Sequence, residues 1–511
     1  MSPLRSASAF LTVVFITVGS VSGQCGGNGA NAGLSTTPFV INSTLSVGVS
    51  GNPTEAFWVF VSSANAVLPV PGLGTVCIDV NSPLFSVVLA GIVPAAGNIL
   101  FPVPIPNDPG LLVGAAFVQG VVNDAGFPGG IGLTQAYRVD FEAADSYLDL
   151  PVMSEPRALS SANLLPDGRV LIAGGGGGSF LVPIPSGTSN IYDPYTRTTN
   201  VGPTMTVARA FHTATTLDDG RVLLCGGVDA VAGTVTATCE IYDPATNSFA
   251  ATASMTTARA AHTATLLQDG RVLVTGGTSL FLGTIGQILN ASTASAAIWS
   301  PTTGMWTATA NAMSSPRFQA AATRLNDGRV LITSGISGAT SLFGVDIPTL
   351  TSSANYFTPA SNSFSAAPSV PNAVVGHRTS ILPNGNVFLS GGAQSVPLGA
   401  PTTGNATAIF NGSSWSSGPN LPDAVALHGQ VVLQNGDLHI FGGLTGTLTA
   451  TSASTSASRF DGTTLTTLNS LPVARGTSVH ALLKSGTILI AGGADVLGVA
   501  VDAMWLYTPL P

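Results

Sequence analysis

The sequence ARAFHTATTLDDGRVLLCGG, at residues 208–227, is repeated almost unchanged as ARAAHTATLLQDGRVLVTGG at residues 258–277. In each copy two short apolar runs flank an Asp-Gly pair, and two glycines end the second run. Asp-Gly readily adopts the positive φ angles that a two-residue turn between antiparallel strands requires. Each copy is therefore predicted to form a β-hairpin.

Seven copies of this pattern follow one another when they are aligned on the turn glycine, and successive turn glycines lie 50 to 58 residues apart. After the glycine pair, each copy has a polar loop, an aromatic strand such as IYDP at 191–194, and a short fourth strand. Four strands at such a period are typical of one blade of a β-propeller. The turn glycines are Gly168, Gly220, Gly270, Gly328, Gly385, Gly436 and Gly486.

The order of these features resembles the kelch repeat, which has an arginine, a hairpin, a glycine pair, an aromatic strand and a second aromatic residue. The resemblance covers about residues 146–511 and implies a seven-bladed kelch-type β-propeller. Two departures are visible. The fourth copy has Ser334-Gly335 in place of the glycine pair, and the last three copies lack the Asp-Gly-Arg turn.

The last copy ends after its third strand, whereas a segment before the first copy looks like a fourth strand. DSYLDLPVMSEPR at 145–157 matches NSFAATASMTTAR at 247–259. We therefore expect Ser146–Leu150 to complete the last blade, which would remove two open sheet edges. The propeller is predicted to occupy residues 143–511.

Residues 24–142 lack the repeat and are predicted to form a small β-sandwich, so the whole chain is expected to be all-β. Strand-like runs such as EAFWVFVSS at 55–63 and SVVLAGIV at 86–93 alternate with Gly, Pro and Asn turns. Short strands with regular turn signals are typical of a sandwich.

Residues 1–23 resemble a secretory signal, with Arg5, an apolar run at 9–18 and Val-Ser-Gly at 21–23. That run is short for a membrane span, and no later run of about 20 apolar residues is present. Only 8% of residues are charged and the net charge is -8, which gives no electrostatic argument for nucleic acid as a partner. We expect a secreted monomer, with attachment to the cell surface, for example as a lipoprotein through Cys25, as the alternative.

Four cysteines fit an oxidising compartment. Cys225 ends the second strand of the second blade and Cys239 begins its third, so a disulfide between these neighbouring strands is plausible and would add about 2–3 kcal/mol. Cys25 and Cys77 would then pair within the first domain. Four free buried thiols are the alternative.

Five arginines recur eleven residues before the turn glycine, where the innermost strand of a blade begins. Guanidinium groups near a channel mouth would favour carboxylates, phosphates or sugar hydroxyls as ligands. The other interpretation is that each arginine bonds loop carbonyls of its own blade, because a structural role recurs in every blade and a binding site does not. The candidate ligand-binding residues are Arg157, Arg209, Arg259, Arg317 and Arg475.

Five histidines lie on one face of the innermost strands and raise the question of a metal: His212, His262, His377, His428 and His480. Galactose oxidase and glyoxal oxidase, which this chain resembles in its kelch repeats, have a tyrosine directly before a copper-binding histidine, and no tyrosine precedes any histidine here. The resemblance also places Arg475, in Ala-Arg-Gly, in a context like that of the substrate-binding arginine of galactose oxidase. We expect structural histidines, no metal and no cofactor.

No phosphate-binding loop, nucleophile elbow or zinc-type spacing stands out, so no catalytic residue is predicted. The loops between second and third strands are longest at 278–297 and 336–355, and binding residues are usually carried on such loops. The sequence therefore favours a non-enzymatic protein that binds a glycan or an extracellular protein. The alternatives are an extracellular oxidase or glycan-active enzyme of the galactose oxidase type, and a structural component of the cell exterior.

Overall fold

The structure is a computed structural model. It describes residues 144–510 except 180–181, 230–233, 343, 397–398 and 448–449, together with the backbone of strands β1 to β11. The chain divides into two compact units, of which the larger contains Arg138–Pro511. The predicted signal at 1–23, Cys25 and Cys77 lie outside the described residues. In the described part, no helix has the length and apolar character needed to cross a membrane.

The amino-terminal strands form small sheets in which antiparallel pairs predominate among those described. β4 (Ala56–Ser62) pairs antiparallel with β7 (Ser86–Ile92) and with β9 (Ala115–Asn123). The all-β prediction therefore agrees with this region, and the sandwich packing of its sheets stays a prediction. The remaining strands are β1 (Gly33–Thr36), β2 (Phe39–Val40), β3 (Thr44–Ser50), β5 (Leu68–Val70), β6 (Gly74–Val76), β8 (Asn98–Pro104), β10 (Ile131–Leu133) and β11 (Tyr137–Glu142).

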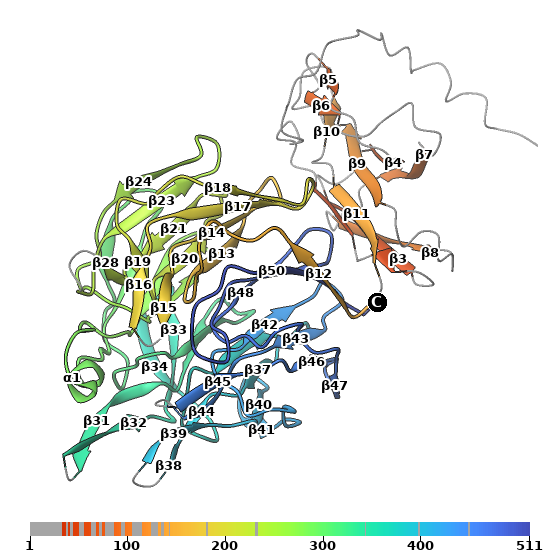
Figure 1. Cartoon of the computed structure of the whole chain (residues 1–511). Helices are drawn as coiled ribbons and strands as arrows, with labels where there is room; N and C mark the ends of the chain where they lie inside the picture. The colour runs from red at the N-terminus through yellow and green to blue at the C-terminus, as the bar shows by residue number, and fades with distance from the viewer. Residues whose placement is uncertain are drawn as a thin grey trace, which may run out of the picture. The chain divides into compact units, whose positions relative to one another are not determined.

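Seven four-stranded antiparallel sheets make up most of the larger unit (Figure 1). The innermost strands are β13 (Ser161–Leu164), β20 (Thr213–Thr216), β25 (Thr263–Leu266), β29 (Ala321–Arg324), β36 (Arg378–Ile381), β42 (Gly429–Val432) and β48 (Val479–Leu482). Each innermost strand contacts that of the next sheet, and β48 contacts β13. The sheets therefore follow one another around a ring, as the blades of a propeller do.

The second strands form the buried centre of each blade. They are short, rich in Val, Ile and Leu, and buried at every position, as suits a strand covered on both faces. They are β14 (Val170–Ala173), β21 (Val222–Cys225), β26 (Val272–Thr275), β30 (Val330–Thr333), β37 (Val387–Ser390), β43 (Leu438–Phe441) and β49 (Ile488–Ala491).

The third strands are mostly buried, whereas the fourth strands are largely polar and exposed. The third strands are β17 (Ser189–Asp193), β23 (Cys239–Asp243), β27 (Ala296–Trp299), β33 (Ala354–Thr358), β40 (Thr407–Phe410), β46 (Ala457–Phe460) and β50 (Met504–Thr508). The fourth strands are β18 (Thr198–Val201), β24 (Ser248–Thr252), β28 (Trp306–Ala308), β34 (Ser363–Ala367), β41 (Trp415–Ser417), β47 (Leu465–Thr467) and β12 (Ser146–Leu150).

The hydrophobic core lies between adjacent blades. One cluster joins Leu171 of the first blade to Leu224 and Tyr242 of the second, and the other interfaces hold similar clusters. Burying such aliphatic and aromatic side chains contributes about 1.5–3 kcal/mol each. The repeat is therefore stable because each blade covers the apolar face of the next.

β12 supplies the fourth strand of the last blade although it precedes the first blade in sequence. It pairs antiparallel with β50 along its whole length, from Ser146 opposite Thr508 to Leu150 opposite Met504. Side chains add to the ladder, since Trp505 Nε1 donates to Asp149 Oδ1 at 2.8 Å. The edge of β50 is therefore covered by another strand instead of being open to water or to another chain.

The Asp-Gly hairpins have three-residue loops, so the predicted two-residue turn is wrong. In the second blade Leu217 N donates to Arg221 O at 2.8 Å, and Gly220 N donates back to Leu217 O at 2.9 Å. Of the loop residues only Gly220 has a positive φ, at 84°. A type I turn followed by one left-handed residue explains why glycine is kept at this position.

The glycine pair links each blade to the next through the backbone. The second glycine donates its N–H to the carbonyl of the arginine-position residue in the following blade, at 2.7 to 2.9 Å. The seventh bond of the series runs from the last blade to the first, so the links close the ring. The pairs are Gly175–Arg209, Gly227–Arg259, Gly277–Arg317, Gly335–Val374, Gly392–Val425, Gly443–Arg475 and Gly493–Arg157.

The first glycine of the pair has no room for a side chain. At Gly226, where φ is +66°, an added Cβ would lie 2.4 Å from the carbonyl oxygen of Arg259 in the next blade. Ser334 takes this position in the fourth blade at φ 53°. Its hydroxyl accepts a hydrogen bond from Val374 N at 2.7 Å, at the point where the next blade has no arginine.

Replacing Gly226 by alanine is expected to lower the free energy of unfolding by about 2–4 kcal/mol, because a strained φ and a clash with a backbone oxygen are combined. Gly304→Ala is the matched control, since φ there is +67° and the nearest atom to an added Cβ is 3.8 Å away. It should cost only about 1–2 kcal/mol. Urea unfolding of both variants measures the difference. Equal losses of stability would show that the clash with the next blade is not what requires glycine at position 226.

Candidate functional site

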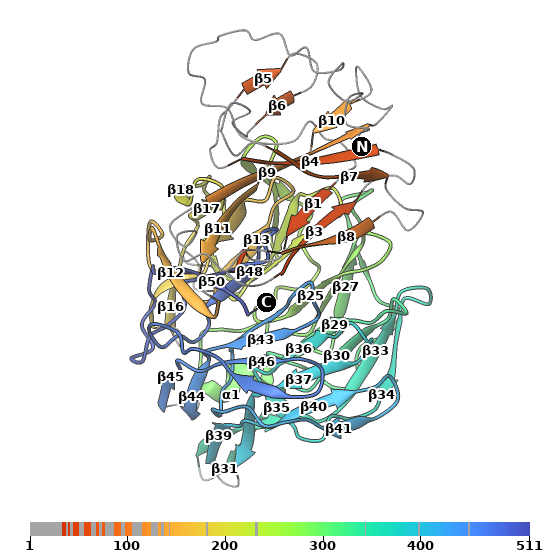
Figure 2. The same cartoon turned by 90° about the vertical axis from the view of Figure 1, so that its right-hand side faces the viewer.

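The loops between second and third strands build a layer of extra structure on one face of the ring. We call this layer the crown, and it consists of the described residues within 176–187, 228–237, 278–294, 336–352, 393–405, 444–455 and 494–502. Figures 1 and 2 show α1 and the crown strands β31, β39, β44 and β45 on the same side of the propeller. Its elements are β15 (Gly176–Ser179), β16 (Val182–Pro185), β22 (Val228–Asp229), α1 (Ile285–Asn290), β31 (Ile336–Leu342), β32 (Val345–Leu350), β38 (Ala393–Val396), β39 (Gly399–Thr403), β44 (Leu444–Thr447) and β45 (Ala450–Ala453). Two further short strands, β19 (Arg209–Ala210) and β35 (Val374–Val375), pair with it.

Crown loops of different blades bond to one another. β39 of the fifth blade pairs with β44 of the sixth through Thr402 and Thr447. Ala500 N of the last blade donates to Gly178 O of the first at 2.9 Å. The crown is therefore a connected layer, and its loops are held in place by their neighbours.

The crown carries most of the exposed large apolar side chains in the described residues. Leu497, in the last blade, is 80% exposed. Isolated exposed apolar residues are common, whereas apolar residues that lie next to one another are typical of an interaction surface; three of these lie within residues 280–285 and three within 496–499. The crown members of this set are Ile184, Leu280, Leu282, Ile285, Val345, Val396, Val496, Leu497 and Val499.

A pocket of about 260 Å³ lies where the innermost strands begin, and we call it the channel mouth. Residues with a positive φ surround it, including Phe211 (55°), Gln319 (51°) and Thr477 (56°). Their peptide groups bond from blade to blade, as when Thr477 N donates to Leu427 O at 3.1 Å. Phe281 of the crown packs on Phe211, with ring centroids 5.3 Å apart. The mouth is thus a rigid ring beside the crown.

The five predicted arginines do not line this pocket. Arg209 is fully buried, and its Nη1 donates to the carbonyls of Gly226 (2.8 Å) and Thr238 (3.0 Å) in its own blade. Arg259 and Arg317 make the corresponding pair of bonds in theirs. Burial lowers the pKa of both to about 10, so they remain charged at neutral pH.

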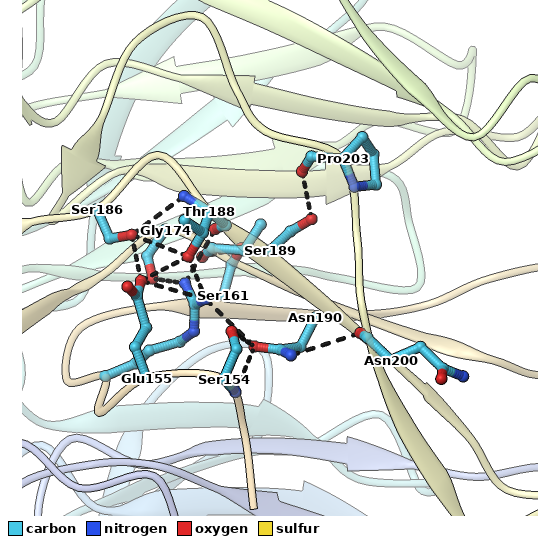
Figure 3. A network of polar contacts seen from close by, with 12 residues as sticks. Ser154, Glu155, Ser161, Gly174, Ser186, Thr188, Ser189, Asn190, Asn200 and Pro203 are labelled. Atoms are coloured by element: carbon cyan, nitrogen blue, oxygen red, sulfur yellow. Dashed lines mark hydrogen bonds and ion pairs between the residues drawn. The ribbon is translucent and has the colours of Figure 1, made fainter.

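The second guanidinium nitrogen, Nη2, bonds side-chain oxygens whose chemistry varies among the blades. Arg209 Nη2 donates to Glu240 Oε1 at 2.8 Å. In the first blade Arg157 Nη2 donates to Asn190 Oδ1 at 3.2 Å, and Figure 3 shows Glu155, Thr188 and Asn190 gathered at this point. Arg475 instead lies over the ring of Trp505, with its Cζ 4.7 Å from the centroid.

This geometry changes the interpretation of Arg157, Arg209, Arg259, Arg317 and Arg475. These side chains are 0–3% exposed, and in the first four blades their terminal nitrogens donate to carbonyl, hydroxyl, amide or carboxylate oxygens of the same blade, while Nε is buried without a partner. A ligand on the surface would not reach them without displacing these bonds. We therefore assign them to bracing the blades, the second of the two interpretations given above.

The histidines form links between blades. Their Nε2 atoms lie 2.7 to 3.1 Å from hydroxyl oxygens of the preceding blade, in the pairs His212–Ser161, His262–Thr213, His377–Thr333 and His428–Ser390. Burial lowers the pKa of His212, His377 and His428 to about 3. The rings are therefore neutral and hydrogen-bonded to neighbouring protein groups.

A copper ion does not fit these residues. Each of the four rings is oriented by a bond from its Nε2 to a hydroxyl of the neighbouring blade, while copper requires several imidazoles directed at one point. Within the described ranges no three His, Cys, Asp or Glu side chains are grouped as metal ligands.

Comparison with known proteins agrees with the fold. Residues 208–256 match the kelch motif family model. A fungal alcohol oxidase of the AA5 family, solved in complex with copper, is similar at 15% identity and a TM-score of 0.53, over 71% of this chain and 75% of that one. The chain contains a kelch-type β-propeller. The structure of YjhT is matched at 16% identity and a TM-score of 0.46, over 63% of this chain and 99% of that one. No curated protein matches the sequence.

The cysteines of the kelch propeller do not form the predicted disulfide in this structure. Cys225 and Cys239 are directly opposite in β21 and β23, as predicted, but both are free buried thiols. Burial raises the pKa of Cys225 well above its usual value, which disfavours the reactive thiolate. In this state the pair packs as two small apolar side chains in the core between the second and third blades.

One charged residue of the kelch propeller's channel mouth was missed at the sequence level. Arg378 begins the innermost strand of the fifth blade, where Ser161, Thr213 and Ala321 stand in other blades. The alignment of the repeats contains this signal, because a long cationic side chain replaces a short one. Arg378 is not part of any recurring pattern, since an arginine occurs at this position in one blade.

Proposed function

We propose that this protein is a secreted, non-enzymatic binding protein that uses the crown of its kelch propeller to hold a glycan or an extracellular protein. The observation that carries this proposal is the gathering of exposed apolar side chains on the crown. Because the loops bond to one another, the surface is ordered before binding, which reduces the entropic cost of association. The propeller below supplies the rigid scaffold.

Two observations favour binding over catalysis. The recurring arginines and histidines, which are the residues best suited to chemistry, bond to groups within the propeller. The similarity to the copper-containing alcohol oxidase is at 15% identity and concerns the fold. An oxidase therefore receives no support from a specific residue.

A glycan array and a panel of extracellular matrix proteins, probed with the purified protein, test the proposal. The double variant Leu282→Ser/Leu497→Ser should lose at least about tenfold in affinity for whatever ligand the wild type binds, since two exposed anchors are removed. Met305→Ser is the control, because Met305 is 58% exposed but lies in a turn between third and fourth strands. Retained binding by the double variant, or copper-dependent oxidation of galactose by the wild type, would contradict the proposal.

A further inference from the structure

The channel mouth contains a positive charge without a counterion. Arg378 is the charged residue among those that line this pocket, and within the described residues no carboxylate lies at ion-pair distance from it. Its Nε donates to His428 O at 3.0 Å, which leaves the two terminal nitrogens of the guanidinium free to face the pocket. Its side chain retains solvent exposure, unlike the bracing arginines.

The surroundings do not neutralise this charge. The histidines nearest to it, His377, His428 and His480, have lowered pKa values, caused first by burial and then by the positive charge of Arg378. A guanidinium in such a place gains most from an anion, because opposite charges interact more strongly where water is partly excluded.

A second polar group in the pocket also lacks a partner. Thr477 is 6% exposed, lines the channel mouth, and its Oγ1 is buried without a hydrogen bond. Ser160, Ser478 and Gln319 add further polar side chains to the wall. Buried hydroxyls are normally satisfied, so an unsatisfied one on a residue that lines a pocket indicates a place for a ligand atom.

We propose that the channel mouth binds a small oxyanion, a carboxylate or a phosphate, with the guanidinium of Arg378 as its cationic partner and the hydroxyl of Thr477 as a further donor. A bidentate guanidinium–oxyanion contact has the required geometry. A volume of about 260 Å³ corresponds to roughly eight or nine water molecules and suits a ligand of about ten non-hydrogen atoms. This site goes beyond the proposed function, because it uses none of the apolar crown residues.

Isothermal titration with acetate, malate and inorganic phosphate, each against chloride at equal ionic strength, tests the site. The wild type should bind at least one probe saturably, and the preferred probe shows whether carboxylate or phosphate is favoured. Arg378→Met should weaken that binding by about tenfold or more. Arg324→Met is the matched control, because Arg324 also lies on an innermost strand and its Nη1 donates to a neighbouring blade, to Leu266 O at 3.0 Å.

A second measurement does not depend on how the variant folds. Modification of wild-type Arg378 by phenylglyoxal, followed by mass spectrometry of its peptide, should be slowed by the bound probe and not by chloride. Absence of saturable binding, equal binding by Arg378→Met, or unprotected Arg378 would overturn the proposal. The crown variant Leu282→Ser/Leu497→Ser should bind the anion normally, so failure of the crown proposal and failure of this one can be told apart.

Discussion

Replacing Arg209 by methionine is expected to lower the free energy of unfolding by about 3–5 kcal/mol, the usual cost of removing one partner of a buried ion pair. Arg209 and Glu240 are 2.8 Å apart, and their side chains are 0% and 1% exposed. The variant would leave the Glu240 carboxylate buried beside only the backbone donors of Thr206 and Val207, and two carbonyls without a donor.

Urea unfolding of a graded series would check this result. Arg221→Met is the control: Arg221 pairs with Asp219 on the surface, where a salt bridge contributes about 0–1 kcal/mol. Arg259→Met should lower the free energy of unfolding by an amount between those of Arg209→Met and Arg221→Met. Arg259 bonds carbonyl and hydroxyl oxygens, so its removal leaves no buried carboxylate unpaired. Adding Glu240→Gln to Arg209→Met should restore part of the loss. If Arg209→Met were no more harmful than Arg221→Met, the bracing role would be wrong.

Acid is expected to destabilise the propeller well before its carboxylates titrate. Burial lowers the pKa of His212, His377, His428 and His480 to about 3, from an ordinary value of 6.5. Below about pH 6.5 these histidines are protonated in the unfolded chain, whereas in the folded chain they stay neutral down to about pH 3. The free energy of unfolding therefore decreases as the pH falls through this window. From pH 7.5 to 5.5 each such histidine costs about 1.4 kcal/mol, or about 5–6 kcal/mol for the four.

This loss is comparable to the whole stability of many domains. Urea unfolding at pH 7.5, 6.5 and 5.5 gives the slope of stability against pH. His377→Gln should reduce the loss of stability between pH 7.5 and 5.5 by about 1.4 kcal/mol, about half a proton in the mean slope, because it removes one titrating group, which is buried and paired with Thr333. An unchanged free energy of unfolding between pH 7.5 and 5.5 would contradict the placement of the histidines in the core between blades.

Much of the fold could be predicted because the same sequence pattern recurs in every blade. The apolar second strands, the glycine pairs and the position of Ser146–Leu150 all follow from periodicity. The requirement for glycine at position 226 could not be predicted from periodicity, because it comes from the close approach of the Arg259 carbonyl in the next blade. The three-residue hairpin loop was also missed, because Asp-Gly fits more than one turn geometry and the hydrogen bonds decide between them.

The candidate site was harder to predict, because binding residues need not recur. Periodicity pointed to Arg209 and its equivalents, and recurrence itself is the mark of a structural role. Arg378 breaks the pattern and lies in the pocket. The crown strands β31 and β32 were missed as strands because they lie in loops of unequal length, where no repeat defines a register.

Strand β12 closes the ring, and a cross-strand disulfide tests this closure directly. Leu148 lies opposite Leu506, and directly opposed residues of antiparallel strands have Cα atoms at disulfide distance. Under mild oxidation Leu148→Cys/Leu506→Cys should form an intramolecular bond, seen by non-reducing electrophoresis and mass spectrometry, whereas Leu148→Cys/Met504→Cys, two residues out of register, should not. Failure of the first pair to cross-link, or equal yields for both, would contradict the closed ring.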